Sequence, residues 1–266
     1  MNYKIISTDF DGTLLTTDKK VTEKTRKTLL TLKNNNYIIV GITARNLTSV
    51  SNVCDIDIFD YLILNNGTVL YDVKNRSENN IAYLKNKTVN KISLHFASIS
   101  RGIYYFSPNN CYIYSLEMPI PHSYFIKINS LEDINEKISR INIFTKENND
   151  LEIYKNYLTS NFIDIDPIVM EDSDKIPNIK WLAINPKKVN KLSTLEILCS
   201  KLNISLNEVI FFGDAINDLE IIKNVGLGVA VSNALPEVKK LAKKITLSND
   251  ENGVAHFLNI FLNNKK

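Results

Sequence analysis

Acidic side chains follow two short apolar runs in the sequence, one near each end of the chain. Asp9 and Asp11 come after the run at residues 4–7, in Asp-Phe-Asp-Gly-Thr, and Asp214 comes after the run at residues 208–212. In an extended segment Asp9 and Asp11 point to the same side, where their charges repel unless a cation lies between them. With Asp214 as a third carboxylate, the set offers the oxygen ligands that Mg²⁺ prefers. The spacing therefore predicts a magnesium site.

Two further apolar runs also end in polar residues. The run at 37–40 precedes Thr43, and the run at 61–64 precedes Asn65-Asn66-Gly67. Each aspartate by itself has a simpler interpretation, because Asp beside Gly is common in turns. A chance Asp-x-Asp-Gly-Thr in a chain of this length, however, has a probability of about a few in a thousand. Because the carboxyl ends of parallel strands meet at one crevice, we expect all four strand ends to contribute to one site.

The elements that would position these residues are typical of an α/β protein. Continuous β-branched runs such as those above are what strands buried on both faces require. Thr22 is suited to cap a helix that continues to Lys33, which would complete a βαβ unit. Late in the chain we expect another strand at 228–231, and helices at 191–202, 218–224 and 236–244. Parallel α/β character is thus predicted at both ends of the chain.

The middle of the chain, from about residue 72 to 180, has a different pattern. Its apolar segments are shorter, more aromatic and alternating, and turn residues separate them, which favours hairpins and an antiparallel sheet. We expect strands at 103–106, 111–114 and 141–144, and helices at 89–98, 131–137 and 151–158. The predicted fold is a Rossmann-like parallel-sheet α/β core with an inserted α+β domain of antiparallel sheet plus helices. The core would comprise residues 1–73 and 186–266, and the insertion residues 74–185.

The four motifs resemble those of the haloacid dehalogenase superfamily, and within it the Cof-type phosphatases, whose inserted domain is a type IIB cap. The matching parts are Asp-Phe-Asp-Gly-Thr-Leu-Leu from Asp9, Thr43 in Thr-Ala-Arg, Lys191, Gly213 to Asp218, Asn66-Gly67-Thr68 and Ser232-Asn233-Ala234. The chain departs from the common pattern at Ala44, where many relatives have glycine. The added methyl group fits there if the backbone has negative φ.

The resemblance implies a role for each aspartate of the first motif. Asp9 would attack phosphorus and form an aspartyl-phosphate. Asp11 would protonate the leaving alkoxide and then deprotonate the attacking water. Mg²⁺ would be held by the carboxylate of Asp9, the backbone carbonyl of Asp11 and the carboxylate of Asp214, and it would reduce the repulsion between nucleophile and phosphate.

The resemblance also implies a cradle for the phosphate oxygens. Thr43 and Lys191 would bind these oxygens together with Asn217 and the backbone N–H groups of Phe10 and Ala44.

Two of the implied assignments leave alternatives open. Lys191 is preferred over its neighbours Lys187 and Lys188 because it begins a predicted helix. Asp218 could contact the metal through water, orient Lys191, or simply stand at the start of a helix. The aromatic residues near Tyr104 and Tyr112 could stack on a sugar, but alternating aromatics in strands are more often packed in a core.

We expect a Mg²⁺-dependent phosphatase that acts on small phosphorylated metabolites, with sugar phosphates as the favoured class. A sugar phosphomutase of the same superfamily is the first alternative, although only three arginines of residues 74–185 (Arg76, Arg101 and Arg140) could anchor a second phosphate. A non-catalytic phosphometabolite sensor is the second, and the presence of both Asp9 and Asp11 argues against it. No glycine-rich phosphate loop of the Walker type occurs, which disfavours a nucleotide-dependent kinase.

Composition narrows the class further. The chain has 32 Lys and Arg against 29 Asp and Glu among 266 residues, so a dedicated nucleic-acid binder is not indicated. Its three cysteines form no CxxC pair, which suits a reducing compartment. No long apolar run is present, so we expect neither a signal peptide nor a membrane helix. The expected protein is cytoplasmic, a monomer or weak homodimer, without nucleic-acid or membrane partners.

Overall fold

The computed structural model describes residues 3–115, 125–147, 150–171 and 180–264. The chain divides into two compact units, and each is described by itself. One unit contains residues 1–45, 50–79 and 191–266, and the other contains residues 46–49 and 80–190. The first is called the core unit below and the second the cap unit.

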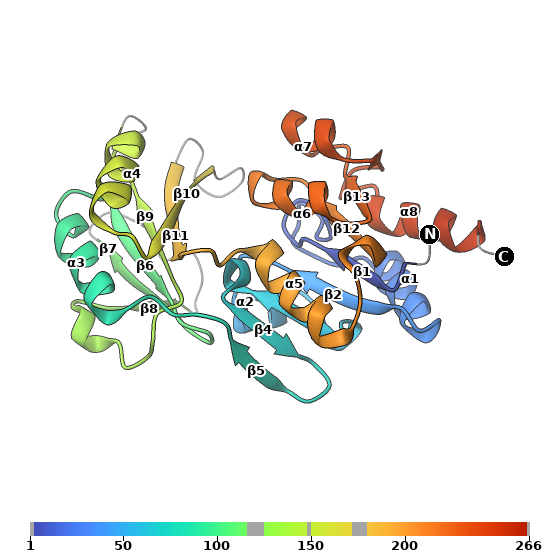
Figure 1. Cartoon of the computed structure of the whole chain (residues 1–266), viewed down its shortest axis with the longest axis horizontal. Helices are drawn as coiled ribbons and strands as arrows, with labels where there is room; N and C mark the ends of the chain where they lie inside the picture. The colour runs from blue at the N-terminus through green and yellow to red at the C-terminus, as the bar shows by residue number, and fades with distance from the viewer. Residues whose placement is uncertain (1–2, 116–124, 148–149, 172–179, 265–266) are drawn as a thin grey trace. The chain divides into compact units, whose positions relative to one another are not determined.

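The core unit is built on an eight-stranded sheet with the order β14-β13-β12-β1-β2-β3-β4-β5 (Figure 1). Six of these strands run parallel, from β14 to β3, while β4 is antiparallel to β3. Every residue of β1 is buried, as expected for a strand covered on both faces. The strands are β1 (Ile5–Thr8), β2 (Ile38–Ile42), β3 (Tyr61–Leu64), β4 (Val69–Asp72), β5 (Ser77–Asn80), β12 (Val209–Gly213), β13 (Leu227–Ala230) and β14 (Lys244–Ile245).

The helices predicted for the two ends of the chain are present in the core unit. Thr22 caps α1 by accepting a hydrogen bond from the backbone N–H of Thr25. The helix predicted at 236–244 is shorter than expected, because α7 ends at Leu241 and the chain then enters strand β14. The C-terminal helix α8 was not predicted. The bounds are α1 (Glu23–Asn34), α5 (Lys191–Leu202), α6 (Leu219–Asn224), α7 (Pro236–Leu241) and α8 (Gly253–Asn263). The short helix α2 (Leu47–Ser51) is divided between the units, with residues 47–49 in the cap unit and residues 50–51 in the core unit.

The cap unit is a six-stranded sheet with the order β10-β11-β9-β6-β7-β8, packed against two helices. Its strand pairs are antiparallel except β7 and β8, which run parallel. This one pair differs from the predicted all-antiparallel sheet. The elements are α3 (Asn86–Phe96), β6 (Gly102–Phe106), β7 (Cys111–Ser115), β8 (Phe125–Lys127), β9 (Arg140–Phe144), α4 (Asp150–Asn161), β10 (Ile165–Glu171) and β11 (Lys180–Pro186).

The helix predicted at 131–137 is wrong, since this segment forms a single 3₁₀ turn at Leu131–Asp133. Ser130 and Asp133 form a capping box around that turn, and Ile134 leaves it with extended backbone angles. The capping box thus supports the start of a helical turn, but the extended backbone of Ile134 stops it after that one turn.

The aromatic residues of the cap unit alternate between the two faces of its sheet. Tyr105 and Tyr112 belong to the apolar core that includes residues of α3 and α4, and the Tyr105 hydroxyl donates to Ser93 over 2.8 Å. Tyr104 and Phe106 belong to a separate cluster with Phe144. Packing in cores accounts for these tyrosines, as the alternation predicted.

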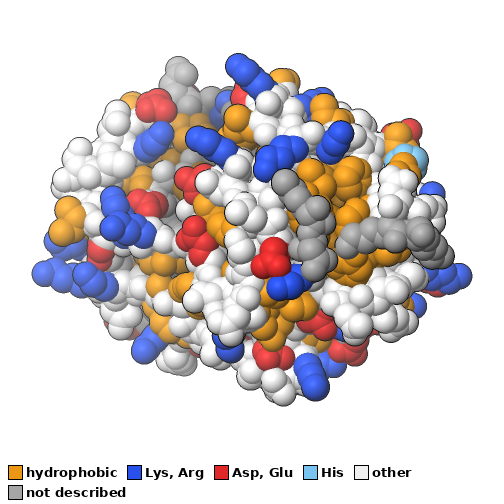
Figure 2. All heavy atoms as spheres, turned by 45° about the vertical axis from the view of Figure 1, so that its right-hand side comes forward, with side chains coloured by type: hydrophobic (Ala, Val, Ile, Leu, Met, Phe, Trp, Pro, Cys, Tyr) orange, Lys and Arg blue, Asp and Glu red, His pale blue; other side chains and the backbone are white. Residues whose placement is uncertain are grey.

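Charges of both signs are mixed on the surface. On the face shown in Figure 2, Lys and Arg side chains lie among Asp and Glu side chains. Over the residues that the structure describes, no helix has the length and apolar character needed to cross a membrane.

Candidate active site

The loop after β1 places Asp9 at the centre of the candidate site. Asp9 is 6% exposed, and its backbone N–H donates to the carbonyl of Phe212 in β12 over 2.9 Å. The next turn depends on Gly12, whose φ is +78°. A Cβ atom at Gly12 would lie only 2.4 Å from Oδ2 of Asp214. The glycine therefore allows the first motif to lie directly against the acidic loop after β12.

Lys191 is the cation of this site. It is the first residue of α5, it is 1% exposed, and its ammonium lies 2.6 Å from Oδ1 of Asp9 and 2.7 Å from Oδ1 of Asp218. Burial disfavours the ammonium, but the charges of Asp218 and Asp9 outweigh this and raise the pKa of Lys191. Its neighbours Lys187 and Lys188 are exposed. Of the three lysines, the structure thus brings Lys191 to the aspartates.

Asp218 is fully buried and uses both carboxylate oxygens within the protein. One oxygen pairs with Lys191, and the other accepts from the backbone N–H groups of Asp214 at 3.0 Å and Ala215 at 3.1 Å. A carboxylate held in this way fixes both the ammonium and the shape of the loop. The geometry favours the role of orienting Lys191 among those left open by the sequence.

Three carboxylates of the described residues could hold a metal ion. Asp9, Asp214 and Asp218 each offer an oxygen, and these oxygens lie within 4.8 Å of one another. Burial and the charge of Asp218 raise the pKa of Asp214 to about 7, although a hydrogen bond of 2.6 Å from the Thr13 hydroxyl acts in the opposite direction. Crowded, buried carboxylates are stabilised by a divalent cation, so the donor set fits Mg²⁺. The third carboxylate of this cluster is that of Asp218, while the expected contribution of Asp11 to the metal, through its backbone carbonyl, stays a prediction.

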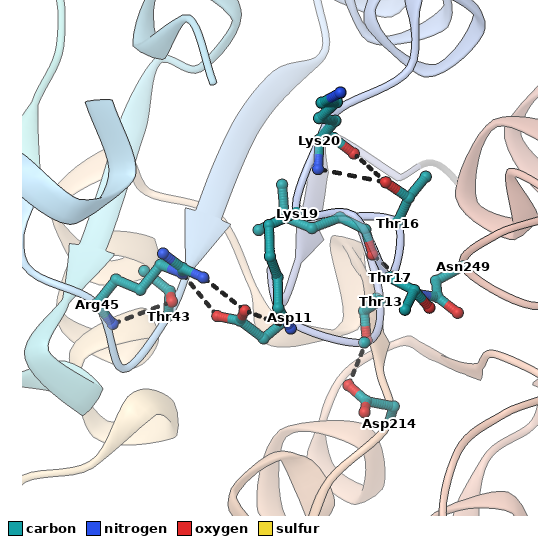
Figure 3. A network of polar contacts seen from close by, with 12 residues as sticks. Asp11, Thr13, Thr16, Thr17, Lys19, Lys20, Thr43, Arg45, Asp214 and Asn249 are labelled. Carbon is teal, nitrogen blue, oxygen red and sulfur yellow. Dashed lines mark hydrogen bonds and ion pairs between the residues drawn. The ribbon is translucent and has the colours of Figure 1, made fainter. Parts of the chain in front are cut away.

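The side chain of Asp11 instead lies between two cations (Figure 3). Arg45 donates to it twice, from Nε to Oδ2 over 2.7 Å and from a terminal nitrogen to Oδ1 over 2.6 Å, and the ammonium of Lys19 lies 3.3 Å from Oδ1. Burial raises the pKa of Asp11, but the hydrogen bonds and charge of Arg45 outweigh it and leave the pKa lowered. Neither cation was predicted. The place of Arg45 in the Thr-Ala-Arg motif could have indicated that it contacts the site. No motif in the sequence indicates such a contact for Lys19.

Thr43 is almost fully buried directly after β2. Its backbone N–H donates to Ile63 over 2.8 Å, and its hydroxyl accepts from the backbone N–H of Arg45 over 3.1 Å. Ala44 is not among the residues with positive φ, so its methyl group is compatible with the backbone there. Phe10 is buried against Phe59, which leaves its backbone as the part able to serve the site.

A left-handed segment after β3 connects Thr43 with Asn217. Asn65, Asn66 and Gly67 have φ of 49°, 59° and 104° in succession, and such strained backbone persists where surrounding contacts hold it. The backbone N–H of Asn66 donates to the carbonyl of Thr43 over 3.0 Å, and its side-chain oxygen accepts from the amide of Asn217 over 3.4 Å. The segment thus brings two predicted phosphate-binding residues to the same side of the site.

The comparison with known proteins decides the family. A sequence model of haloacid dehalogenase-like hydrolases matches residues 6–258. The chain belongs to this family. YxeH of Bacillus subtilis (strain 168) is 30% identical, with 96% of each chain covered, and the 5-amino-6-(5-phospho-D-ribitylamino)uracil phosphatase YitU of the same organism is 25% identical over 96% of each. The Cof-type resemblance seen in the sequence is confirmed, and the protein is a phosphatase.

The solved structures show the same fold. The HAD subclass IIB sugar phosphatase BT4131 superposes with a TM-score of 0.78 at 17% identity, covering 97% of this chain and 98% of the other. The predicted fold class, a parallel-sheet core with a separate cap, is thereby confirmed.

Proposed function

We propose that this phosphatase uses Mg²⁺ to hydrolyse small phosphorylated metabolites, sugar phosphates in particular, through an aspartyl-phosphate on Asp9. The observation that carries the proposal is the buried contact of 2.6 Å between Lys191 and Asp9, beside the carboxylate of Asp214. A carboxylate held in this way has a fixed direction of attack. The sugar class is supported by the names of two similar proteins, since one is a sugar phosphatase and the other acts on a phosphoribityl compound.

The carboxylates of Asp9 and Asp214, with the backbone carbonyl of Asp11, would hold the magnesium ion. When bound, Mg²⁺ supplies positive charge that reduces the repulsion between the nucleophile and an anionic phosphate. Asp218 would stay with Lys191, because both of its oxygens already accept hydrogen bonds.

In the first half of the reaction, an oxygen of Asp9 forms a bond to phosphorus while the bond from phosphorus to the ester oxygen breaks. This step uses the protonated form of Asp11, although Arg45 holds the pKa of that carboxyl group below its usual value. The leaving alkoxide takes the proton of the Asp11 carboxyl group and departs as an alcohol. Lys191, Thr43, Asn217 and the backbone N–H groups of the two motif loops would bind the phosphoryl oxygens during this transfer.

In the second half, the carboxylate of Asp11 removes a proton from a water molecule, whose oxygen then attacks phosphorus. The bond between phosphorus and Asp9 breaks, which releases inorganic phosphate and restores the aspartate. Arg45 stabilises the ionised form of Asp11 that this half requires, through its two hydrogen bonds.

A substrate panel tests the proposal. Purified protein should release free phosphate from sugar monophosphates in the presence of Mg²⁺, and a chelator should abolish release until Mg²⁺ is restored. No sugar bisphosphate should be needed. Isomerisation of the sugar phosphate without release of phosphate would instead indicate a mutase. Binding without any turnover across the panel would indicate a sensor.

A further inference from the structure

Lys19 lies in a tight turn that follows the first motif. The backbone N–H of Lys19 donates to the carbonyl of Thr16 over 2.8 Å, and that of Thr16 donates to the carbonyl of Lys20 over 3.0 Å. The φ of Lys19 is 59°, a left-handed value that is uncommon for a residue other than glycine. The turn therefore holds Lys19 in a costly conformation that surrounding contacts maintain.

The same turn is tied to the loop before α8. Asp250 accepts from the backbone N–H of Thr17 and from its hydroxyl, both over 2.8 Å. One residue earlier, the amide of Asn249 donates to the carbonyl of Leu15 over 2.9 Å. Two consecutive side chains from the far end of the sequence thus fix both the start and the body of the turn.

These contacts set the direction of the Lys19 side chain. From the turn, Lys19 reaches back toward Asp11 and places its ammonium 3.3 Å from Oδ1, the oxygen that also accepts from Arg45, while the side chain of Lys20 points away (Figure 3). The two side chains of the ion pair are 24% and 42% exposed, and pairs this accessible contribute little to stability. An effect on the position of the carboxylate is then the larger expected consequence.

We infer that Lys19 is a positioning residue for the reaction, which orients the Asp11 carboxyl group toward the leaving group. The inference rests on the proposed function, in which Asp11 gives a proton to the departing oxygen. Arg45 approaches both carboxylate oxygens, and Lys19 contacts the shared oxygen from the separate, anchored turn. Together they fix the plane of the carboxyl group, and without Lys19 that plane depends on Arg45 alone.

The test compares two leaving groups that carry the same phosphate. An alkoxide needs a proton in order to leave, whereas p-nitrophenolate leaves well without one, so a displaced Asp11 matters more for alkyl phosphates. In Lys19→Met we expect kcat to fall about tenfold on an alkyl phosphate and about twofold or less on p-nitrophenyl phosphate. The tenfold loss is smaller than the whole contribution of general acid catalysis, about 100-fold or more, because Asp11 is displaced and not removed. KM should change by less than about twofold on both substrates, since Lys19 is assigned no substrate contact.

Three further variants complete the experiment. Lys19→Arg should recover most of the alkyl rate, because it restores the cation. Lys20→Met is the matched control and should behave as the wild type. Asp250→Ala should reproduce the unequal loss by loosening the turn, so the inference stays testable if Lys19→Met folds poorly.

Equal losses of kcat on both substrates, a change in KM alone, or no recovery in Lys19→Arg would overturn the inference while leaving the proposed function intact. A wild-type protein that releases phosphate from neither substrate would overturn both. The two failures are therefore distinguishable in one set of assays.

Discussion

Replacement of Lys191 by Met should cost both stability and activity. The substitution keeps an unbranched apolar chain as far as Cε. It removes the ammonium of a residue that is 1% exposed, and that ammonium lies 2.6 Å from Asp9 and 2.7 Å from Asp218. Removing one partner of a buried ion pair costs about 3–5 kcal/mol, because the remaining charge is left buried and unpaired. At about 2–4 °C per kcal/mol, the melting temperature should fall by about 6–20 °C. The rate of phosphate release should fall by at least about 100-fold, since a donor to the transferring phosphoryl group is lost.

The loss of stability in Lys191→Met should depend on pH. Burial raises the pKa of Asp9, and the charge of Lys191 is the main effect that lowers it, so removing Lys191 raises this pKa further. A raised pKa means that the folded state penalises the ionised carboxylate. The penalty is fully present above the raised pKa and disappears as the pH falls below the unfolded value. The difference in melting temperature from the wild type should therefore be smaller at about pH 5 than at about pH 8.

Thermal unfolding followed by circular dichroism, together with phosphate release, measures both effects. Lys187→Met is a suitable control, because that lysine is exposed and its ion pair with Asp166 contributes about 1 kcal/mol or less. A Lys191→Met variant that melts within about 2 °C of the wild type, which corresponds to less than about 1 kcal/mol, would refute this prediction. Equal losses of activity in the two lysine variants would refute it as well.

Two other predictions concern the acidic cluster. Gly12→Ala should lower the melting temperature, because a φ of +78° costs about 1–2 kcal/mol for alanine. It should also weaken the binding of Mg²⁺ measured by calorimetry, because the new methyl group would press on Asp214. Unchanged binding would contradict this prediction. Burial and the charge of Asp218 raise the pKa of Asp214 to about 7, so protons compete with the metal for this carboxylate below that pH. As the pH is raised towards about 7, the affinity for Mg²⁺ should increase by up to about tenfold per pH unit, and above about pH 7 it should level off. An affinity that stays constant from about pH 5 to pH 8 would show that Asp214 does not exchange a proton for the metal.

The features that were predicted correctly are mainly those that depend on residues close together in the sequence, such as strands, helix starts and helix caps. Continuous β-branched runs identified buried strands, and the polar residues after them lie in the loops where the acidic cluster forms. Lys191 was selected from three nearby lysines because it begins a helix, and it is the buried one. The Thr22 cap of α1 also followed from residue type and position.

Other features depend on contacts between residues distant in sequence. The pairing of Asp11 with Arg45 and Lys19 is a choice of side-chain direction, which the spacing of a motif does not determine. The turn that contains the left-handed Lys19 is anchored through Thr17 by Asp250, more than two hundred residues away. Strand β14 replaced the end of a predicted helix because Lys244 and Ile245 pair with β13, and this tertiary pairing overrides local helix propensity.

The central claim is that Asp9 carries the phosphoryl group during turnover. Acid quenching of the enzyme during steady-state hydrolysis of a sugar phosphate, followed by proteolysis and mass spectrometry, tests it directly. We expect a phosphoryl group on the peptide that contains Asp9, and none in Asp9→Asn, which should also be inactive. A phosphorylated peptide from elsewhere in the chain, or full turnover by Asp9→Asn, would contradict the account.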